Sequence, residues 1–175
     1  MKSRIALFGI GLTLLLSPVR LAVADPFTYT TIDFPGVMHS SAATGINNAS
    51  RIVGYYDMKH GFLDNGVSFK TIDVPGSQTT FPFGINGARR IVGFFGDIGL
   101  GQLCGPKKPT HGFLDSGGSF TTIDVPGATQ TCAYGINDLG QIVGLFSDTT
   151  GTHGFPASPN DGTGERGSLV AGTRQ

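Results

Sequence analysis

The chain has 175 residues, of which 39% are hydrophobic and 14% are charged, and its twelve Lys and Arg residues balance its twelve Asp and Glu residues. This length suits one domain, and cations that are balanced by acids and scattered along the chain offer no electrostatic footprint for nucleic acid. The sequence therefore predicts a small globular protein with no nucleic-acid partner.

The first 24 residues have the order of a secretory signal peptide. Lys2 and Arg4 precede an apolar run at residues 5–16, and the small residues Ala22-Val23-Ala24 end the segment. The run is shorter than the roughly 20 apolar residues that span a bilayer, and Arg20 interrupts any longer helix. We expect cleavage after Ala24 and a secreted or periplasmic product of 151 residues with nine cations and twelve acids. A retained membrane anchor is the alternative.

Three phrases then recur in the same order along the chain. The first holds Thr-Ile-Asp before a Pro-Gly turn, the second joins Gly-Ile-Asn to Ile-Val-Gly, and the third is His-Gly-Phe. The first stands at 27–36, 68–76 and 119–127, the second at 44–57, 83–97 and 134–148, and the third at 60–66, 111–118 and 153–159.

The spacing of the phrases predicts the domain organisation. Ile32 and Ile72 are 40 residues apart, and Ile72 and Ile123 are 51 apart, because the middle repeat carries an insertion at 98–110. Such a period is typical of a repeat architecture. We therefore expect a three-repeat domain at 25–158, with repeats at about 27–66, 67–118 and 119–158, and a disordered tail at 159–175.

Each repeat predicts four short strands. The β-branched Thr-Ile-Asp phrase is expected to be the first strand, and it ends at Pro-Gly because proline cannot donate to a strand ladder. Gly-Ile-Asn and Ile-Val-Gly have hairpin spacing, and His-Gly-Phe-Leu is a short fourth strand. No stretch after the leader carries apolar residues at helical spacing over three turns, so the predicted class is all-β.

The Ile-Val-Gly strands predict how the repeats pack. They are apolar at consecutive positions, so both faces should be covered, and Gly54, Gly93 and Gly144 in their middle indicate close approach of another backbone. Sheets stacked on like sheets satisfy both requirements. Three repeats of four short antiparallel strands therefore predict a propeller-blade-like array, a partial propeller, since ordinary propellers have about 4 to 8 blades. A closed three-fold, β-trefoil-like fold is the alternative.

Together these phrases resemble a known family. Gly-Ile-Asn, a turn, Ile-Val-Gly, a variable loop and His-Gly-Phe-Leu are similar to the extracellular repeats named for their His-Ala-Phe motif, the HAF repeats of exported bacterial proteins. The resemblance covers most of residues 27–158 and implies export and a propeller-like array. It departs where Gly112 replaces the family's Ala, and where Asp64 and Asp115 stand at a position usually held by Trp. It supplies no catalytic residue.

Cys104 and Cys132 are the two cysteines of the chain, and both fall in stretches that the pattern predicts as loops. Export would place them where a disulfide persists, which favours a bond between them, with two free thiols as the alternative. Two cysteines alone are too few ligands for a metal site.

Two sets of equivalent polar residues are candidates for chemistry. They are His60, His111 and His153, which open equivalent strands, and Asp33, Asp73 and Asp124, which precede equivalent turns. In a closed three-fold fold the histidines would converge on one Zn²⁺, but in a partial propeller each is expected to bond to a neighbouring loop. The aspartates are expected to cap their turns. No motif identifies a nucleophile, so the sequence predicts no catalytic, cofactor-binding or metal-binding residue, no cofactor and no enzyme activity.

The expected function is that of an exported binding or interaction module of unknown specificity. Its partner would be a protein or a glycan, and apolar faces at the end blades offer self-association as a further interpretation. One alternative is an extracellular carbohydrate-active hydrolase that uses repeat aspartates as acid and base. Another is a structural envelope component or a truncated array. No membrane partner is expected after removal of the leader.

Overall fold

The computed structural model describes residues 27–37, 40–97, 104 and 109–159. The leader expected at 1–24 and residues 160–175 of the expected tail lie outside this part. The chain divides into two units at Thr30 and Thr31, and the strands of the described part all belong to the second unit. No helix in these residues has the length and apolar character to cross a membrane.

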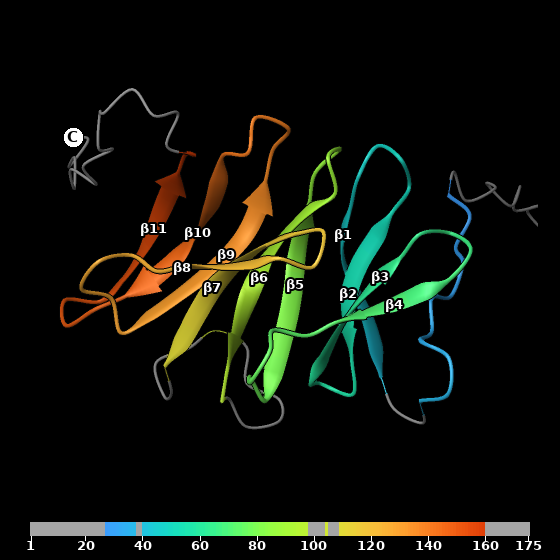
Figure 1. Cartoon of the computed structure of the whole chain (residues 1–175), viewed down its shortest axis with the longest axis horizontal. Coiled ribbons are helices and arrows are strands. Elements are labelled where there is room, and N and C mark those ends of the chain that lie inside the picture. The colour runs from blue at the N-terminus through green and yellow to red at the C-terminus, as the bar shows by residue number, and fades with distance from the viewer. Residues whose placement is uncertain (1–26, 38–39, 98–103, 105–108, 160–175) are drawn as a thin grey trace, which may run out of the picture. The chain divides into compact units, whose positions relative to one another are not determined.

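The fold is all-β, as predicted. Within the described residues, antiparallel strands form three separate sheets of four, four and three strands, and no closed barrel. The first sheet contains β1 (Ser41–Ile46), β2 (Ile52–Tyr56), β3 (His60–Asp64) and β4 (Phe69–Ile72). The second contains β5 (Thr79–Ile85), β6 (Arg90–Gly96), β7 (Thr110–Ser116) and β8 (Phe120–Ile123). The third contains β9 (Gln130–Ile136), β10 (Ile142–Ser147) and β11 (Thr152–Ala157). Figure 1 shows the sheets following one another in chain order, from teal through green and yellow to red.

The sheets are out of phase with the predicted repeats. The Thr-Ile-Asp phrase was expected to open each repeat, but it forms β4 and β8, which pair with β3 and β7 as the last strands of their sheets. The short connection explains the pairing, because Asn65 Oδ1 accepts hydrogen bonds from the N–H groups of Val67 and Ser68 and so tightens the β3–β4 hairpin. The first copy of the phrase, at 27–33, is in no strand.

The glycines in the middle of β2, β6 and β10 confirm the close approach of a backbone, but the backbone belongs to the same sheet. A Cβ added to Gly93 would overlap the carbonyl oxygen of Phe81 on β5 and lie 2.7 Å from the ring of Phe113 on β7. The strand register shifts next to this point in all three sheets, so a β-bulge brings the carbonyl group in. The equivalent contacts are Gly54 with Ala42 and Phe62, and Gly144 with Cys132 and Phe155.

Neighbouring sheets pack face to face through apolar side chains. Val53 of β2 shares a buried cluster with Ile85 of β5. Val92 of β6 lies in the next cluster, and Ile136 of β9 is partly buried against that cluster. Both faces of the second sheet are therefore covered, as its continuous apolar sequence predicts.

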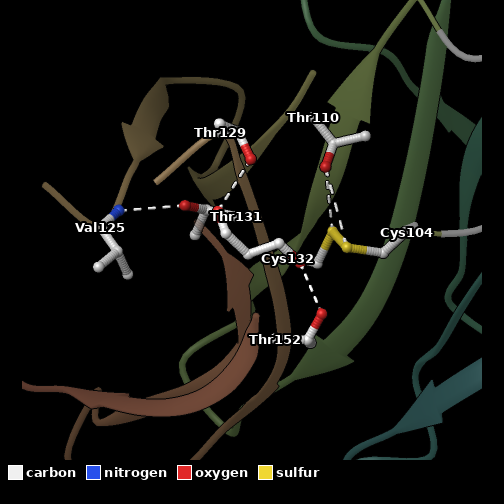
Figure 2. Close-up of a disulfide and its surroundings, with 8 residues drawn as sticks. Cys104, Thr110, Val125, Thr129, Thr131, Cys132 and Thr152 are labelled. Atoms are coloured by element: carbon white, nitrogen blue, oxygen red, sulfur yellow. Dashed lines mark hydrogen bonds between the residues drawn. A yellow bond between two sulfur atoms is a disulfide. The ribbon is translucent and has the colours of Figure 1, made fainter. Parts of the chain in front are cut away.

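Cys104 and Cys132 form the expected disulfide, with their Cα atoms 6.3 Å apart. Figure 2 shows the hydroxyl group of Thr110 beside both sulfur atoms, with Oγ1 3.3 Å from Cys132 Sγ and 3.8 Å from Cys104 Sγ. The loop predicted around Cys132 is wrong, because this residue lies fully buried within β9. The bond therefore ties the insertion between β6 and β7 to the first strand of the third sheet.

Candidate functional site

Two of the predicted histidines pair with two of the predicted aspartates. His60 Nδ1 on β3 lies 2.7 Å from Asp73 Oδ2, and His111 Nδ1 on β7 lies 2.8 Å from Asp124 Oδ2. Asp73 Oδ1 also accepts a hydrogen bond of 3.3 Å from the Gly61 N–H. Each aspartate follows the last strand of its sheet, so it bonds to the neighbouring strand and does not cap its own turn. The pair fastens the end of the outer strand to the strand beside it.

The third histidine lacks such an aspartate. His153 on β11 has its Nε2 atom 3.0 Å from Thr150 Oγ1 and 3.5 Å from Asp148 Oδ1, and its Nδ1 atom has no partner among the described residues. Hydrogen bonds donated by the Thr150 hydroxyl group and backbone N–H lower the pKa of Asp148 below its ordinary value. The remaining predicted aspartate, Asp33, lies exposed before the first sheet, and the described part of the chain offers its carboxylate no hydrogen bond.

The histidines do not form a metal site in the described residues. Nowhere in this part of the chain do three or more His, Cys, Asp or Glu side chains lie close enough together to hold a metal ion. The zinc site considered for a closed three-fold fold is therefore not realised here, because the histidines lie on three separate sheets.

The outer face of the third sheet repeats a packing surface, but no other sheet of the described residues lies beside it. Val143 on β10 occupies the position of Val53 and Val92, which are 0% exposed because they face the following sheet. Val143 is 55% exposed. The exposure of this valine therefore distinguishes the third sheet from the first two.

Equivalent glycines show the same contrast. A Cβ at Gly84 would lie 2.9 Å from the carbonyl oxygen of Tyr134 in the following sheet. A Cβ at Gly45 would likewise crowd the Phe83 carbonyl group. At Gly135, in the third sheet, the same Cβ would meet within 4 Å only a methyl group of its own sheet. The backbone that fills this position in the first two sheets therefore has no counterpart in the third among the described residues.

A shallow groove lies on the outer face of the third sheet, at the place where a following sheet packs on the first two sheets. It has a volume of about 330 Å³ and an apolar floor from all three strands of the sheet. Its lining includes Gly135 and Ile136 of β9, Ile142 and Val143 of β10, and Pro156 and Ala157 of β11.

A column of asparagines links the sheets and ends at this groove. Asn47 Nδ2 donates to the Asn86 carbonyl oxygen over 2.9 Å, and Asn86 Nδ2 donates to the Asn137 carbonyl oxygen over 3.0 Å. Asn137 Nδ2 donates to Gln141 Oε1 of its own turn, 2.7 Å away. Asn47 and Asn86 are buried, and the side-chain amide of each donates to the following sheet. Asn137 holds the equivalent position in the third sheet, but it is exposed.

One isoleucine of the first sheet is exposed in a complementary way, whereas Tyr56 and Phe62 of that sheet are buried and contact the ring of Phe34. Ile46 on β1 is 64% exposed, whereas the equivalent Ile85 is 6% exposed because it packs on the sheet before it. The array therefore has two unlike ends: one exposes the valine that receives a following sheet, and the other exposes the isoleucine that packs on a preceding sheet.

Sequence reasoning expected apolar faces at the end blades, but it named none of the residues that form them. Alignment of the repeats could have identified these residues. Val143, Gly135 and Asn137 align with residues of the first two repeats, each of which is followed by a further repeat, whereas the third repeat is the last one in the alignment. Comparison with protein-family models, with curated proteins and with solved structures finds no match to this chain. The resemblance to HAF repeats thus stays a prediction.

Proposed function

We propose that the chain is an exported binding module and that the uncovered face of its third sheet is the surface that binds. The observation that carries this proposal is the exposure of Val143 at a position where Val53 and Val92 are fully buried. Burial of a valine side chain contributes about 1.5–3 kcal/mol, so a partner that covers this face gains free energy. Exposed apolar patches with a polar rim are typical of protein-binding surfaces.

The aliphatic floor of the groove and the strand edge beside it favour a protein partner over a glycan. The floor of the groove is aliphatic, and β11 offers an open strand edge beside it. This edge has no neighbouring strand in the described part of the chain, and an extended segment can add to it through main-chain hydrogen bonds while its side chains cover the groove. No specific observation favours the hydrolase alternative, because Asp73 and Asp124, the aspartates that it would use as acid and base, follow strands of separate sheets.

Site-specific photocrosslinking tests this proposal. A photoreactive phenylalanine derivative would replace Val143 in the full chain, expressed in a host that exports it. The control is the same replacement at Val67, an almost fully exposed valine in the turn before β4. We expect light-dependent crosslinks from position 143 and few from position 67. Equal yields at the two positions, or none at 143, would contradict the proposal.

Export is tested separately on the same preparation. Mass spectrometry of the protein recovered outside the cytoplasm should show an N-terminus at Asp25, since Ala22-Val23-Ala24 is the expected cleavage signal. A chain that stays in the cytoplasm with its first 24 residues attached would contradict this half of the proposal.

A further inference from the structure

In the described residues, the third sheet has three strands, and the strand that completes the other two sheets is not among them. In the first and second sheets, β4 and β8 pair with β3 and β7, and each carries the Thr-Ile-Asp phrase. The third sheet has the order β11-β10-β9, so the equivalent edge of β11 is open in the described structure.

A spare copy of this strand precedes the first sheet. Residues 27–33 read Phe-Thr-Tyr-Thr-Thr-Ile-Asp, which matches the sequences of β4 and β8 from the aromatic residue to the aspartate, with Tyr29 at the position of Phe69 and Phe120. This segment belongs to no strand, and Tyr29 is exposed. In the described part of the chain, one strand-forming segment therefore lies outside any sheet, and one sheet has three strands where the others have four.

The connection after the spare copy matches the two connections between sheets. The Phe34 N–H donates to Ser41 Oγ over 3.1 Å. The N–H groups of Val74 and Val125 make the same bond to the threonine at the equivalent place on β5 and β9, and Figure 2 shows the second of these bonds, to Thr131. Phe34 thus leads into the first sheet as Val74 and Val125 lead from a completed sheet into the next one.

The histidine and the aspartate that lack their usual partner in the described residues belong to the same two incomplete parts. In the completed sheets, a histidine at the start of β3 or β7 bonds to the aspartate just after β4 or β8. His153 stands at the start of β11 without that aspartate, and Asp33 follows the spare strand without a histidine. A hydrogen bond between Asp33 and His153 would complete both the third sheet and the pairing of residues 27–33.

We propose that two copies of this chain close head to tail into one ring of six blades, with residues 27–33 of each copy forming the fourth strand of the other copy's third sheet. This inference rests on the proposed binding face and names its occupant. By analogy with the registers of β4 and β8, Ile32 pairs with Gly154 and Thr31 with Phe155 of the other copy, and Asp33 then reaches the His153 Nδ1 atom.

The faces of the two ends fit the same arrangement. Ile46 of one copy covers Val143 of the other, which repeats the contact of Ile85 with Val53 inside the chain. The Asn137 amide group then donates to the Asn47 carbonyl oxygen and continues the asparagine column. Unlike ends that meet head to tail form a ring where the rotation closes, and six blades lie within the range of about 4 to 8 found in propellers.

The first test is the solution mass of the exported full chain and of two variants, by light scattering on a sizing column. We expect a dimer for the unmodified protein and for Val67→Asp, and a monomer for Val143→Asp. Burial of an unpaired carboxylate should raise the dimer dissociation constant about 100-fold or more. Both valines are exposed in the single chain, so neither change should impair folding. A monomeric unmodified protein, or a Val143→Asp variant that stays dimeric, would overturn the inference.

The second test locates the exchanged strand. The photoreactive residue would replace Tyr29 in a mixture of ¹⁴N- and ¹⁵N-labelled copies, and mass spectrometry would identify the crosslinked peptides. We expect light-to-heavy crosslinks to the peptide that contains Ala157, the residue opposite Tyr29 in the proposed register. Crosslinks only within a copy would overturn exchange between copies. Crosslinks from position 143 to a different protein would also overturn this inference, but would leave the proposed binding function standing.

Discussion

The disulfide between Cys104 and Cys132 should carry a large share of the folding stability. The two residues are 28 positions apart in the sequence. Treated as loop closure in the unfolded chain, a crosslink of this span removes about 12 cal/mol/K of entropy, or about 3.6 kcal/mol at 25 °C. Domains of this size are stable by about 5–15 kcal/mol, so the bond would supply a quarter or more of the total.

The variant Cys104→Ala tests this magnitude. It removes the crosslink but keeps the buried Cys132 side chain in its cluster with Phe81 and Phe94, so little packing is lost. Urea unfolding, followed by circular dichroism at one fixed protein concentration, should show a loss of about 2–4 kcal/mol. Cys132→Ala should cost more, because it also removes a fully buried sulfur atom.

A reductant provides the matched control. It should shift the unfolding midpoint of the unmodified protein toward that of Cys104→Ala, and should leave the variant itself unchanged. If the reduced and oxidised proteins unfold within about 0.5 kcal/mol of each other, loop closure does not stabilise this fold and the reasoning is refuted.

Five further substitutions, grouped in three comparisons, test the packing between sheets. Each is made in the Val143→Asp background, which we expect to be monomeric, and is measured by urea unfolding. Gly84→Ala places a Cβ 2.9 Å from the Tyr134 carbonyl oxygen and should lower the free energy of unfolding by about 1–3 kcal/mol. Gly135→Ala should lower that of the monomer by less than about 1 kcal/mol. Equal losses would refute the close approach of the following sheet. Asn86→Ala removes two part-buried hydrogen bonds, one donated to the Asn137 carbonyl oxygen and one accepted from the Arg90 N–H, and should cost about 1–3 kcal/mol. Asn137→Ala, at the exposed end of the column, should cost less than half as much, and the reverse order would contradict the role of the column. Burial raises the pKa of Tyr134 above its ordinary value of 10.0. This tyrosine therefore ionises at lower pH in the unfolded chain than in the folded one, and the free energy of unfolding falls as pH rises above about 10. Tyr134→Phe should lose less stability over that range, and parallel pH profiles of the two proteins would refute the role of Tyr134.

The repeated phrases were sufficient to predict the all-β class and the series of like sheets. These features are local, since β-branched residues, asparagine turns and Pro-Gly breaks act within a few positions of one another. The disulfide was also predictable, because the chain has only two cysteines. The HAF resemblance and the leader predict export, and that prediction stands for the experiment above to test.

The order of strand pairing could not be read from the phrases. Thr-Ile-Asp has a strand-forming sequence in all three copies, but it forms a strand only where a His-Gly-Phe strand precedes it in the chain, as in β4 and β8. The pairing of His60 with Asp73 follows from that geometry, because the antiparallel hairpin brings together two side chains 13 residues apart.

The sequence by itself determined which segments extend, where they turn and which of their faces are apolar, since each of these properties depends on residues close together in the chain. Only the tertiary structure decided which apolar faces are buried. Val92 and Val143 stand in nearly identical strands, but one is covered and the other exposed, because burial depends on the presence of a neighbouring sheet. Both the candidate site and the proposed ring come from that difference.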